Sequence, residues 1–178
     1  NLPKNLNLSK EFLLNKKYLS RMVTSYDKRA MELYLLLLAH SQTTGKQEFL
    51  ISLEAMALSL GMPDSWTCTA LRRQVIKSLK KLQKRYQLIE VNFVYNRDAN
   101  VMLTDISEDT FAISSDSLIQ PDDDKLTMRL KFLLIIQALL KEGGEDLYSI
   151  SKTALAKRFN VNLLTIKAAF KDLEVYKE

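Results

Sequence analysis

The sequence predicts a mainly α-helical chain with a short β-hairpin, organised as two tandem units of one fold. The first observation is an internal repeat, because residues 30–62 align without gaps on residues 129–161 when the chain is shifted by 99 positions. The second is the order of elements in the first unit, which reads helix, strand, helix, helix and hairpin. The third is an acidic stretch that separates the two copies.

The repeat preserves turn and cap residues as well as apolar ones. Leucine-rich helices align easily by chance, so two unrelated helices remain the alternative, but here the glycine, serine and alanine matches keep the same register. The matched pairs are Gly45 and Gly144, Ser52 and Ser151, Ala55 and Ala154, Ala57 and Ala156, and Gly61 and Asn160. A fixed offset of this kind predicts two copies of the first half of a helix-turn-helix module.

The composition narrows the classes of function. The chain has 178 residues, 47% of them hydrophobic, which is enough for two small cores. Its net charge of +5 favours polyanionic partners. One cysteine, Cys68, and one histidine, His40, exclude a disulfide within the chain, a zinc site of the usual spacing and a Cys/His catalytic pair. The longest apolar run, 132–140, is too short to span a bilayer. We therefore expect a cytoplasmic protein that does not enter a membrane.

The first element expected is an N-terminal amphipathic arm over residues 1–24. Apolar side chains such as Phe12, Leu19 and Met22 alternate there with lysines and an arginine. We expect this arm to form a helix that packs on the first domain, with contact to a partner as a second role.

The first domain is expected over residues 25–106. Its predicted elements are a helix over 27–40, a strand over 49–51, a helix over 53–60 capped by Ser52 and ended by Gly61, a long helix over 67–86, and strands over 88–95 and 101–104. This order is that of a winged helix, in which the last two strands form the hairpin called the wing.

The long helix has two opposite faces. At 100° per residue, one narrow stripe is apolar and the opposite one is basic. The apolar stripe consists of Leu71, Val75, Leu79, Leu82 and Tyr86, and the basic one of Arg73, Lys77, Lys80 and Lys84. Between Ser65 and Ile89 there are seven basic residues and no acidic one. We therefore expect one face to be buried and the other to meet a polyanion. A solvated lysine-rich face is the alternative.

An acidic connector is expected over residues 107–124, since no lysine or arginine occurs between Asp98 and Asp124. Its apolar residues, Phe111 and Ile113 among them, predict that part of it packs along a domain. Pro121 and the run 122–124 mark the start of the second domain.

The second domain is expected over residues 125–178. It repeats the pattern with a helix over 126–141, a strand near 148–150, a helix over 152–159 and a last helix over 163–173. Its wing is missing or truncated, and we expect the sequence to be a trimmed piece of a longer protein. Ala156, Asn160 and Ile166 have the spacing that lets two helices of a helix-turn-helix cross closely, with Asn160 at positive φ.

The candidate DNA-binding residues follow from these helices. In the first domain, the start of the long helix is expected to reach base edges, its later lysines to meet phosphates and Arg97 to enter the neighbouring minor groove or contact the backbone. These residues are Thr67, Thr69, Arg72, Arg73, Gln74, Lys77, Lys80, Lys84 and Arg97. The matching residues of the second copy are Asn162, Thr165, Lys167 and Lys171, on a face diluted by Asp172 and Glu174.

No residue pattern supports catalysis, a cofactor or a metal. The four glycines are not spaced as a phosphate-binding loop, and three consecutive aspartates at 122–124 do not share a face. We therefore expect a protein that is not an enzyme and has no cofactor and no metal site.

The arrangement resembles plasmid and phage replication initiators built from two successive winged-helix domains. The resemblance covers about residues 27–175 and depends on 52–57 and 151–156 with the helices that follow. Residues 18–20, 33–36, 79–82 and 88–91 are also similar to the amino-terminal domain of Gram-positive plasmid initiators. The resemblance implies that both domains dock on successive turns of repeated DNA sites.

The expected function is sequence-specific binding of double-stranded DNA by an initiator fragment that reads origin repeats. A transcriptional regulator of the winged-helix type is the first alternative, and a non-catalytic protein adaptor is the second. The expected partners are double-stranded DNA, the replication or transcription machinery, and a second copy of the chain in a homodimer, with the oligomeric state left open.

Overall fold

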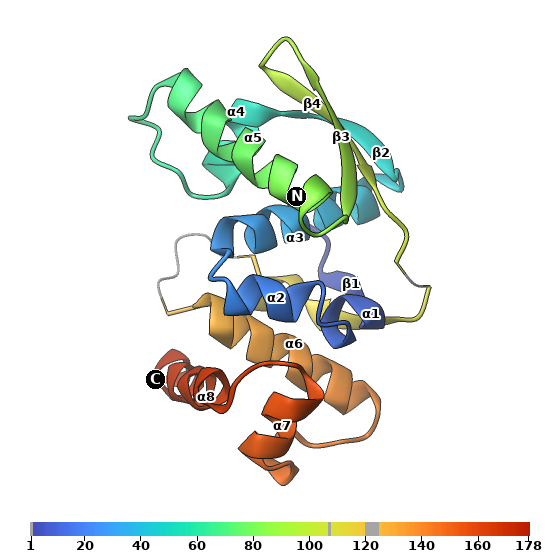
Figure 1. Cartoon of the computed structure of the whole chain (residues 1–178), viewed down its shortest axis with the longest axis vertical. Coiled ribbons are helices and arrows are strands. Elements are labelled where there is room, and N and C mark those ends of the chain that lie inside the picture. The colour runs from blue at the N-terminus through green and yellow to red at the C-terminus, as the bar shows by residue number, and fades with distance from the viewer. Residues whose placement is uncertain (1, 107, 120–124) are drawn as a thin grey trace. The chain divides into compact units, whose positions relative to one another are not determined.

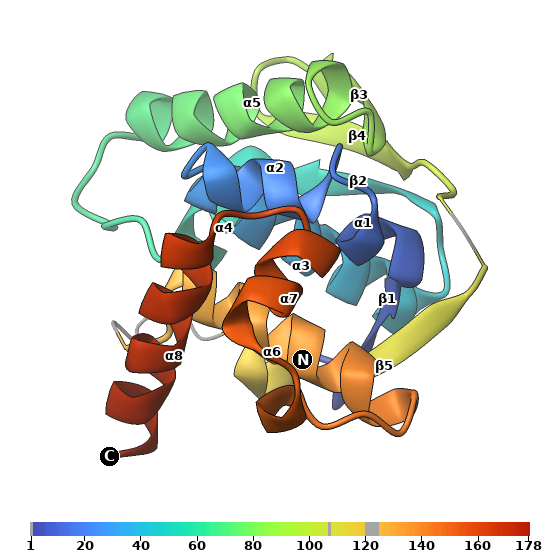
Figure 2. The same cartoon turned by 60° about the horizontal axis from the view of Figure 1, so that its bottom comes forward.

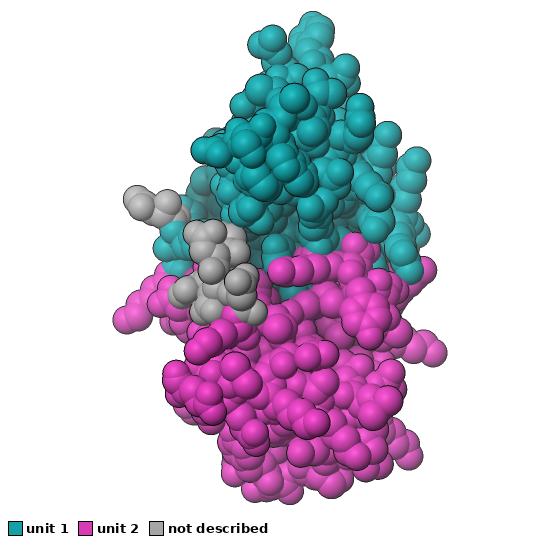
Figure 3. Space-filling model, turned by 90° about the vertical axis from the view of Figure 1, so that its left-hand side faces the viewer, with its two compact units in different colours: residues 1–3, 29–105 teal, residues 4–28, 106–178 magenta. Residues whose placement is uncertain are grey.

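The chain divides into two compact units in a computed structural model, which describes residues 2–106, 108–119 and 125–178. Unit 1 comprises Arg29–Asp105 together with Leu2 and Pro3, and unit 2 comprises Lys4–Lys28 and Ile106–Glu178. Figure 3 distinguishes the two units by colour. Unit 2 is therefore discontinuous in sequence, and the segment that forms most of unit 1 is inserted between its two parts.

Unit 1 contains helices and a three-stranded antiparallel sheet in the order expected from the sequence. Its elements are α3 (Lys28–Thr44, which begins one residue before the unit), β2 (Glu48–Ser52), α4 (Leu53–Ser59), α5 (Cys68–Lys84), β3 (Ile89–Val94) and β4 (Asp98–Leu103). The strand order is β2-β4-β3, with Phe49 opposite Val101 and Val91 opposite the same residue. This element order and strand pairing are consistent with a winged helix (Figure 1).

Local signals set the ends of these helices. The Ser52 hydroxyl accepts a hydrogen bond from the Ala55 amide, and the Thr67 hydroxyl accepts one from the Ala70 amide, so both residues are N-caps. Gly61 has φ of 83°, a left-handed conformation that suits glycine at the end of α4. The expected cap and the expected stop are both confirmed.

The apolar stripe of α5 enters the core of unit 1. Leu71 is 2% exposed, and Val75, Leu79, Leu82 and Tyr86 are fully buried. The stripe packs against α4 and the sheet, and the Gln83 side chain accepts a hydrogen bond of 3.2 Å from the Val91 amide of β3. Burial of each such side chain contributes about 2 kcal/mol to folding, so α5 is held firmly with its opposite face outward.

Unit 2 begins with the N-terminal segment and continues after unit 1. Its elements are β1 (Asn5–Ser9), α1 (Lys10–Leu14), α2 (Leu19–Thr24), β5 (Thr110–Ser114), the 3-10 helix η1 (Ser115–Ser117), α6 (Met128–Glu142), the 3-10 helix η2 (Leu147–Ser149), α7 (Lys152–Arg158) and α8 (Leu163–Lys177). Figure 2 shows α7 and α8 following α6. The core of unit 2 contains Phe132, Leu155 and Ile166, all fully buried.

The expected N-terminal arm over residues 1–24 is helical at Lys10–Leu14 and Leu19–Thr24, but the expectation that it packs on the first domain is wrong, because Lys4–Lys28 belong to unit 2. The segment starts as strand β1, which pairs antiparallel with β5, and Leu6 lies opposite Ile113 in the register. Helices α1 and α2 then contact α6. The physical reason is the alternation of Leu6 and Leu8 with polar residues. This period of two is that of a strand, and it places both leucines on the buried face of β1.

The expected connector over 107–124 is likewise part of unit 2 where the structure describes it. Phe111 and Ile113 of β5 and Leu118 are buried, as the apolar residues of this segment predicted. Ser107 and residues 120–124, which include Pro121 and the three aspartates, lie outside the described residues.

The matched positions of the repeat have matching local structure over most of its length. Gly45 and Gly144 have φ of 71° and 75°, Gly61 and Asn160 have φ of 83° and 61°, and Ser52 and Ser151 both cap the next helix. The strand expected near 148–150 is wrong, because η2 occupies Leu147–Ser149. In unit 1 the matching segment is β2, which pairs with β4, whereas no described strand of unit 2 pairs with residues 147–149. Helix α8 also extends to Lys177, beyond the expected end at residue 173.

Candidate nucleic-acid interface

The outer face of α5 carries the basic side chains that the sequence predicted. Arg73, Lys77, Lys80 and Lys84 are all exposed on the side of the helix opposite the buried stripe. Among the described residues, no acidic side chain forms an ion pair with any of these four. Their charges therefore remain available to an external polyanion.

Three predicted base-reading residues at the start of α5 have partners within unit 1. Thr67 is the N-cap of the helix. An Arg72 nitrogen lies 3.9 Å from a carboxylate oxygen of Glu54 on α4, and the Arg72 side chain is only 25% exposed. Gln74 accepts a hydrogen bond from Arg29. Of the residues predicted in this turn, Thr69 and Arg73 are the exposed ones for which the structure shows no such partner.

The structure adds Arg29 to the basic surface, which the sequence did not reveal. Its guanidinium donates to Gln74 and lies 5.9 Å from the centroid of the Trp66 ring. Arg29 is exposed and lies at the start of α3, 45 residues before Gln74. No spacing pattern in the sequence connects these positions, because the fold alone brings them together.

The hairpin places Arg97 at its tip, although the tip is shorter than expected. The sequence predicted a loop over 96–100, whereas the strands leave only residues 95–97 between them. The Arg97 amide donates to the Val94 carbonyl at 3.2 Å, and Tyr95 and Asn96 have φ of 51° and 58°. These values define a tight three-residue loop with two consecutive residues at positive φ. Lys80 of α5 lies 6.0 Å from the Phe93 ring of the same hairpin.

In unit 2 the predicted candidates fall into two groups. Asn162 is the N-cap of α8, and its side-chain oxygen accepts hydrogen bonds from both the amide and the hydroxyl of Thr165. Both residues line a hollow of about 410 Å³ that Tyr26, Arg129 and Leu164 also border. Lys167 and Lys171 instead line a second hollow of unit 2 with Lys152 and Phe170. Leu164 and Ala168 line both hollows, so the four candidates lie around two adjacent hollows along α8.

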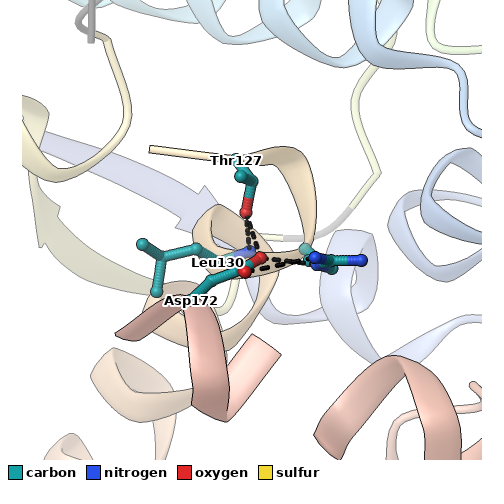
Figure 4. Close-up of polar contacts among 4 residues, drawn as sticks. Thr127, Leu130 and Asp172 are labelled. Carbon is teal, nitrogen blue, oxygen red and sulfur yellow. Dashed lines mark hydrogen bonds and ion pairs between the residues drawn. The ribbon is translucent and has the colours of Figure 1, made fainter. Parts of the chain in front are cut away.

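Asp172, one of the acidic residues expected to reduce the positive charge of this face, accepts hydrogen bonds from two other residues of unit 2. Figure 4 shows Thr127 and Asp172 facing each other, and the Thr127 hydroxyl donates to a carboxylate oxygen at 2.7 Å. Arg129 donates to both oxygens of the same carboxylate. Burial raises the pKa of Asp172, but the hydrogen bonds from Arg129 and Thr127 and the charge of Arg129 outweigh it, so that the net pKa is below its usual range.

A second ion pair in unit 2 engages a basic residue of α7. Arg158, next to Lys157 on α7, donates to both carboxylate oxygens of Glu145 at 3.0 and 2.9 Å. This hydrogen bonding lowers the pKa of Glu145. Glu174 remains exposed on α8, so unit 2 presents a weaker excess of positive charge on this helix than α5 does.

No group of three histidine, cysteine or carboxylate side chains among the described residues has the arrangement of a metal site. No helix within the described ranges has the length and hydropathy needed to cross a membrane.

The chain was compared with protein-family models, with curated proteins and with solved structures, and none of the three comparisons gives a match.

Proposed function

We propose that the chain binds double-stranded DNA in a sequence-specific manner, with α5 of unit 1 in the major groove and the β3–β4 hairpin beside it. The observation that carries the proposal is the outer face of α5, where four basic side chains are exposed and form no ion pair with an acidic side chain among the described residues. A helix with this charge distribution neutralises phosphates and releases counterions, which supplies most of the affinity for DNA.

The division of roles along α5 follows from which side chains have partners in unit 1. Thr69 and Arg73 are exposed near the start of the helix, where a recognition helix meets base edges. Lys77, Lys80 and Lys84 lie further along the same face and fit phosphate contacts. Arg29 is fixed beside Gln74 and extends the positive surface beyond the helix itself.

We further propose that the two units are tandem winged-helix-like modules, and that the protein is a replication initiator fragment that reads origin repeats. The support is the repeat, in which matched helices, caps and positive-φ residues recur at the same offset. A transcriptional regulator would use the same surface. Duplexes selected from a random pool distinguish them, because an initiator recovers direct repeats and a dimeric regulator recovers a single palindrome.

A matched pair of charge reversals tests DNA binding itself. Lys77→Glu changes the charge of the α5 face, and Lys46→Glu makes the same change in the turn before β2. We expect Lys77→Glu to lower affinity for the selected duplex by at least tenfold and to reduce the slope of log affinity against log salt by about 1. Lys46→Glu should change both far less.

Two results would overturn this function. Equal losses for Lys77→Glu and Lys46→Glu would mean that only net charge matters. The absence of measurable binding to any duplex at low salt would favour the protein-adaptor alternative.

A further inference from the structure

Unit 2 carries a cluster of aromatic and basic side chains that duplex binding by unit 1 does not use. Tyr148 of η2 and Phe170 of α8 have ring centroids 6.0 Å apart at an interplanar angle of 62°. Tyr148 is 58% exposed, and Phe170 is half-buried. We call these two rings, with Lys152, Lys167, Lys171 and Lys177, the aromatic–lysine cluster.

Two of the lysines lie over the rings. The ammonium of Lys152 is 5.0 Å from the centroid of Phe170. That of Lys177 is 5.5 Å from the centroid of Tyr148 and donates to its hydroxyl at 3.0 Å. These cation–π contacts on the protein surface are weak and break easily, so each ammonium is free to move to a better anionic partner.

The other two lysines border a hollow next to Phe170. Lys167 and Lys171 line a space of about 530 Å³ together with Lys152, Phe170 and one acidic residue, Glu174. Within the described ranges, no ion pair involves any of the four lysines of the cluster. A concave surface with unpaired cations and accessible rings suits a ligand that is both anionic and flat.

We propose that the aromatic–lysine cluster binds single-stranded nucleic acid. Bases of a single strand stack on aromatic faces while neighbouring lysines meet the phosphates. On binding, a base replaces the ammonium of Lys177 on the Tyr148 ring, and that ammonium moves to an adjacent phosphate on its flexible four-carbon stem. Bases in a duplex are already stacked on each other and leave no face for Tyr148.

The first turn of α8 leaves fewer polar side chains free for base edges than the start of α5 does. Asn162 and Thr165 bond to each other, and Leu164 between them is 75% exposed. A recognition helix needs free polar side chains in this turn to meet base edges. Four lysines of unit 2 that form no ion pair within the described ranges lie instead beside the rings of Tyr148 and Phe170, and this distinguishes unit 2 from the α5 face of unit 1.

The experiment measures fluorescence anisotropy of labelled oligothymidylate, oligouridylate and a duplex of the same length with the full chain. We expect Tyr148→Ala to weaken binding of the single strands by roughly tenfold. Tyr148→Phe keeps the ring and loses the bond from Lys177, and it should retain most of the affinity. Tyr26→Ala removes another exposed tyrosine of unit 2, one outside the cluster, and serves as the matched control for losing an aromatic side chain.

Lysine variants separate the cluster from general charge. We expect Lys171→Gln to weaken single-strand binding several-fold, whereas Lys141→Gln, an exposed lysine on α6, should have little effect. Lys77→Glu should weaken duplex binding and leave oligothymidylate binding nearly unchanged, so the failure of one proposal is distinguishable from the failure of the other.

Three outcomes would overturn the proposal. The first is that wild-type protein binds neither single strand at low salt. The second is that Tyr148→Ala binds the single strands as tightly as wild type does. The third is that Tyr148→Ala weakens the duplex and the single strands equally, which would reassign the cluster to double-stranded DNA. If the proposal holds, the relative affinity of the wild-type protein for oligothymidylate and oligouridylate decides whether the natural ligand is DNA or RNA.

Discussion

Arg129 and Asp172 form a two-point ion pair that fastens the first turn of α6 to α8. Nε of Arg129 lies 2.5 Å from Oδ2 of Asp172, and Nη2 lies 3.1 Å from Oδ1. The Asp172 side chain is 16% exposed, and the Arg129 side chain is 46% exposed. The pair therefore stabilises the packing of the two longest helices of unit 2, although solvent screens the arginine.

We expect Asp172→Asn to lower the free energy of unfolding by about 1 kcal/mol at pH 7, because it removes an ion pair with one half-exposed partner. The folded-state pKa of Asp172 is lowered. Its contribution is therefore present above the unfolded-state pKa of about 4 and is lost as the pH falls through the folded-state pKa. Urea unfolding at pH 7 and pH 3 should show the difference between wild type and variant shrinking at the lower pH. Glu174→Gln on the same helix is the control, and an unchanged difference at pH 3 would contradict the assignment.

Ser20→Ala is expected to stabilise the protein by about 1 kcal/mol. Ser20 is 1% exposed, and its hydroxyl has no hydrogen-bond partner among the described residues. A buried hydroxyl without a partner carries a desolvation cost that alanine does not. The midpoint of urea unfolding measures this effect, and a lower midpoint for the alanine variant would show that the hydroxyl has a partner in solution.

Replacing Asn160 should lower the free energy of unfolding more with alanine than with glycine. Asn160 has φ of 61° at the turn between α7 and α8. Its side-chain Nδ2 donates a hydrogen bond of 3.1 Å to the Leu14 carbonyl. Asn160→Ala loses the hydrogen bond and puts at positive φ a residue that tolerates this conformation less well than asparagine does, so we expect a loss of about 2 kcal/mol. Asn160→Gly also loses the bond, but glycine adopts positive φ without a steric cost, so this variant should lose only about 1 kcal/mol. Thermal unfolding of both variants checks the order, which equal losses would contradict.

Tyr95→Asn is expected to stabilise unit 1 by about 0.5 kcal/mol, since asparagine adopts positive φ more readily than a bulky residue does. Tyr95 has φ of 51° and is 93% exposed at the tip of the hairpin. Thermal unfolding measures the gain. A lower melting temperature would mean that the tyrosine ring packs in a way that its exposure does not reveal. A gain in stability with a loss of duplex affinity would show that the ring contacts DNA.

Unit 1 was largely predictable because its signals are local. The apolar stripe of α5, the cap at Ser52 and the stop at Gly61 each depend on residues within a few positions of one another, and the structure has all three. The basic face of α5 follows from the same periodicity. Arg29 was not predictable, since its position beside Gln74 comes from the packing of two helices distant in sequence.

Unit 2 was less predictable because its sheet joins segments about a hundred residues apart. The alternation of Leu6 and Leu8 fits a strand, and so does that of Phe111 and Ile113, but nothing local indicates that the two segments pair. The repeat suggested a strand near Tyr148 by analogy with β2. That analogy failed because a strand requires a partner, and the described strands of unit 2, β1 and β5, pair with each other.

The pairing of β1 with β5 has a consequence for the order in which the protein is made. The ribosome delivers β1 first and β5 only after all of 29–105 has emerged. Unit 1 is contiguous over this stretch and can complete its core during synthesis, whereas β1 must wait unpaired until its partner strand appears. Translation speed across 29–105 therefore sets how long Leu6 and Leu8 stay uncovered, and the nascent chain is most open to aggregation or chaperone capture in that interval.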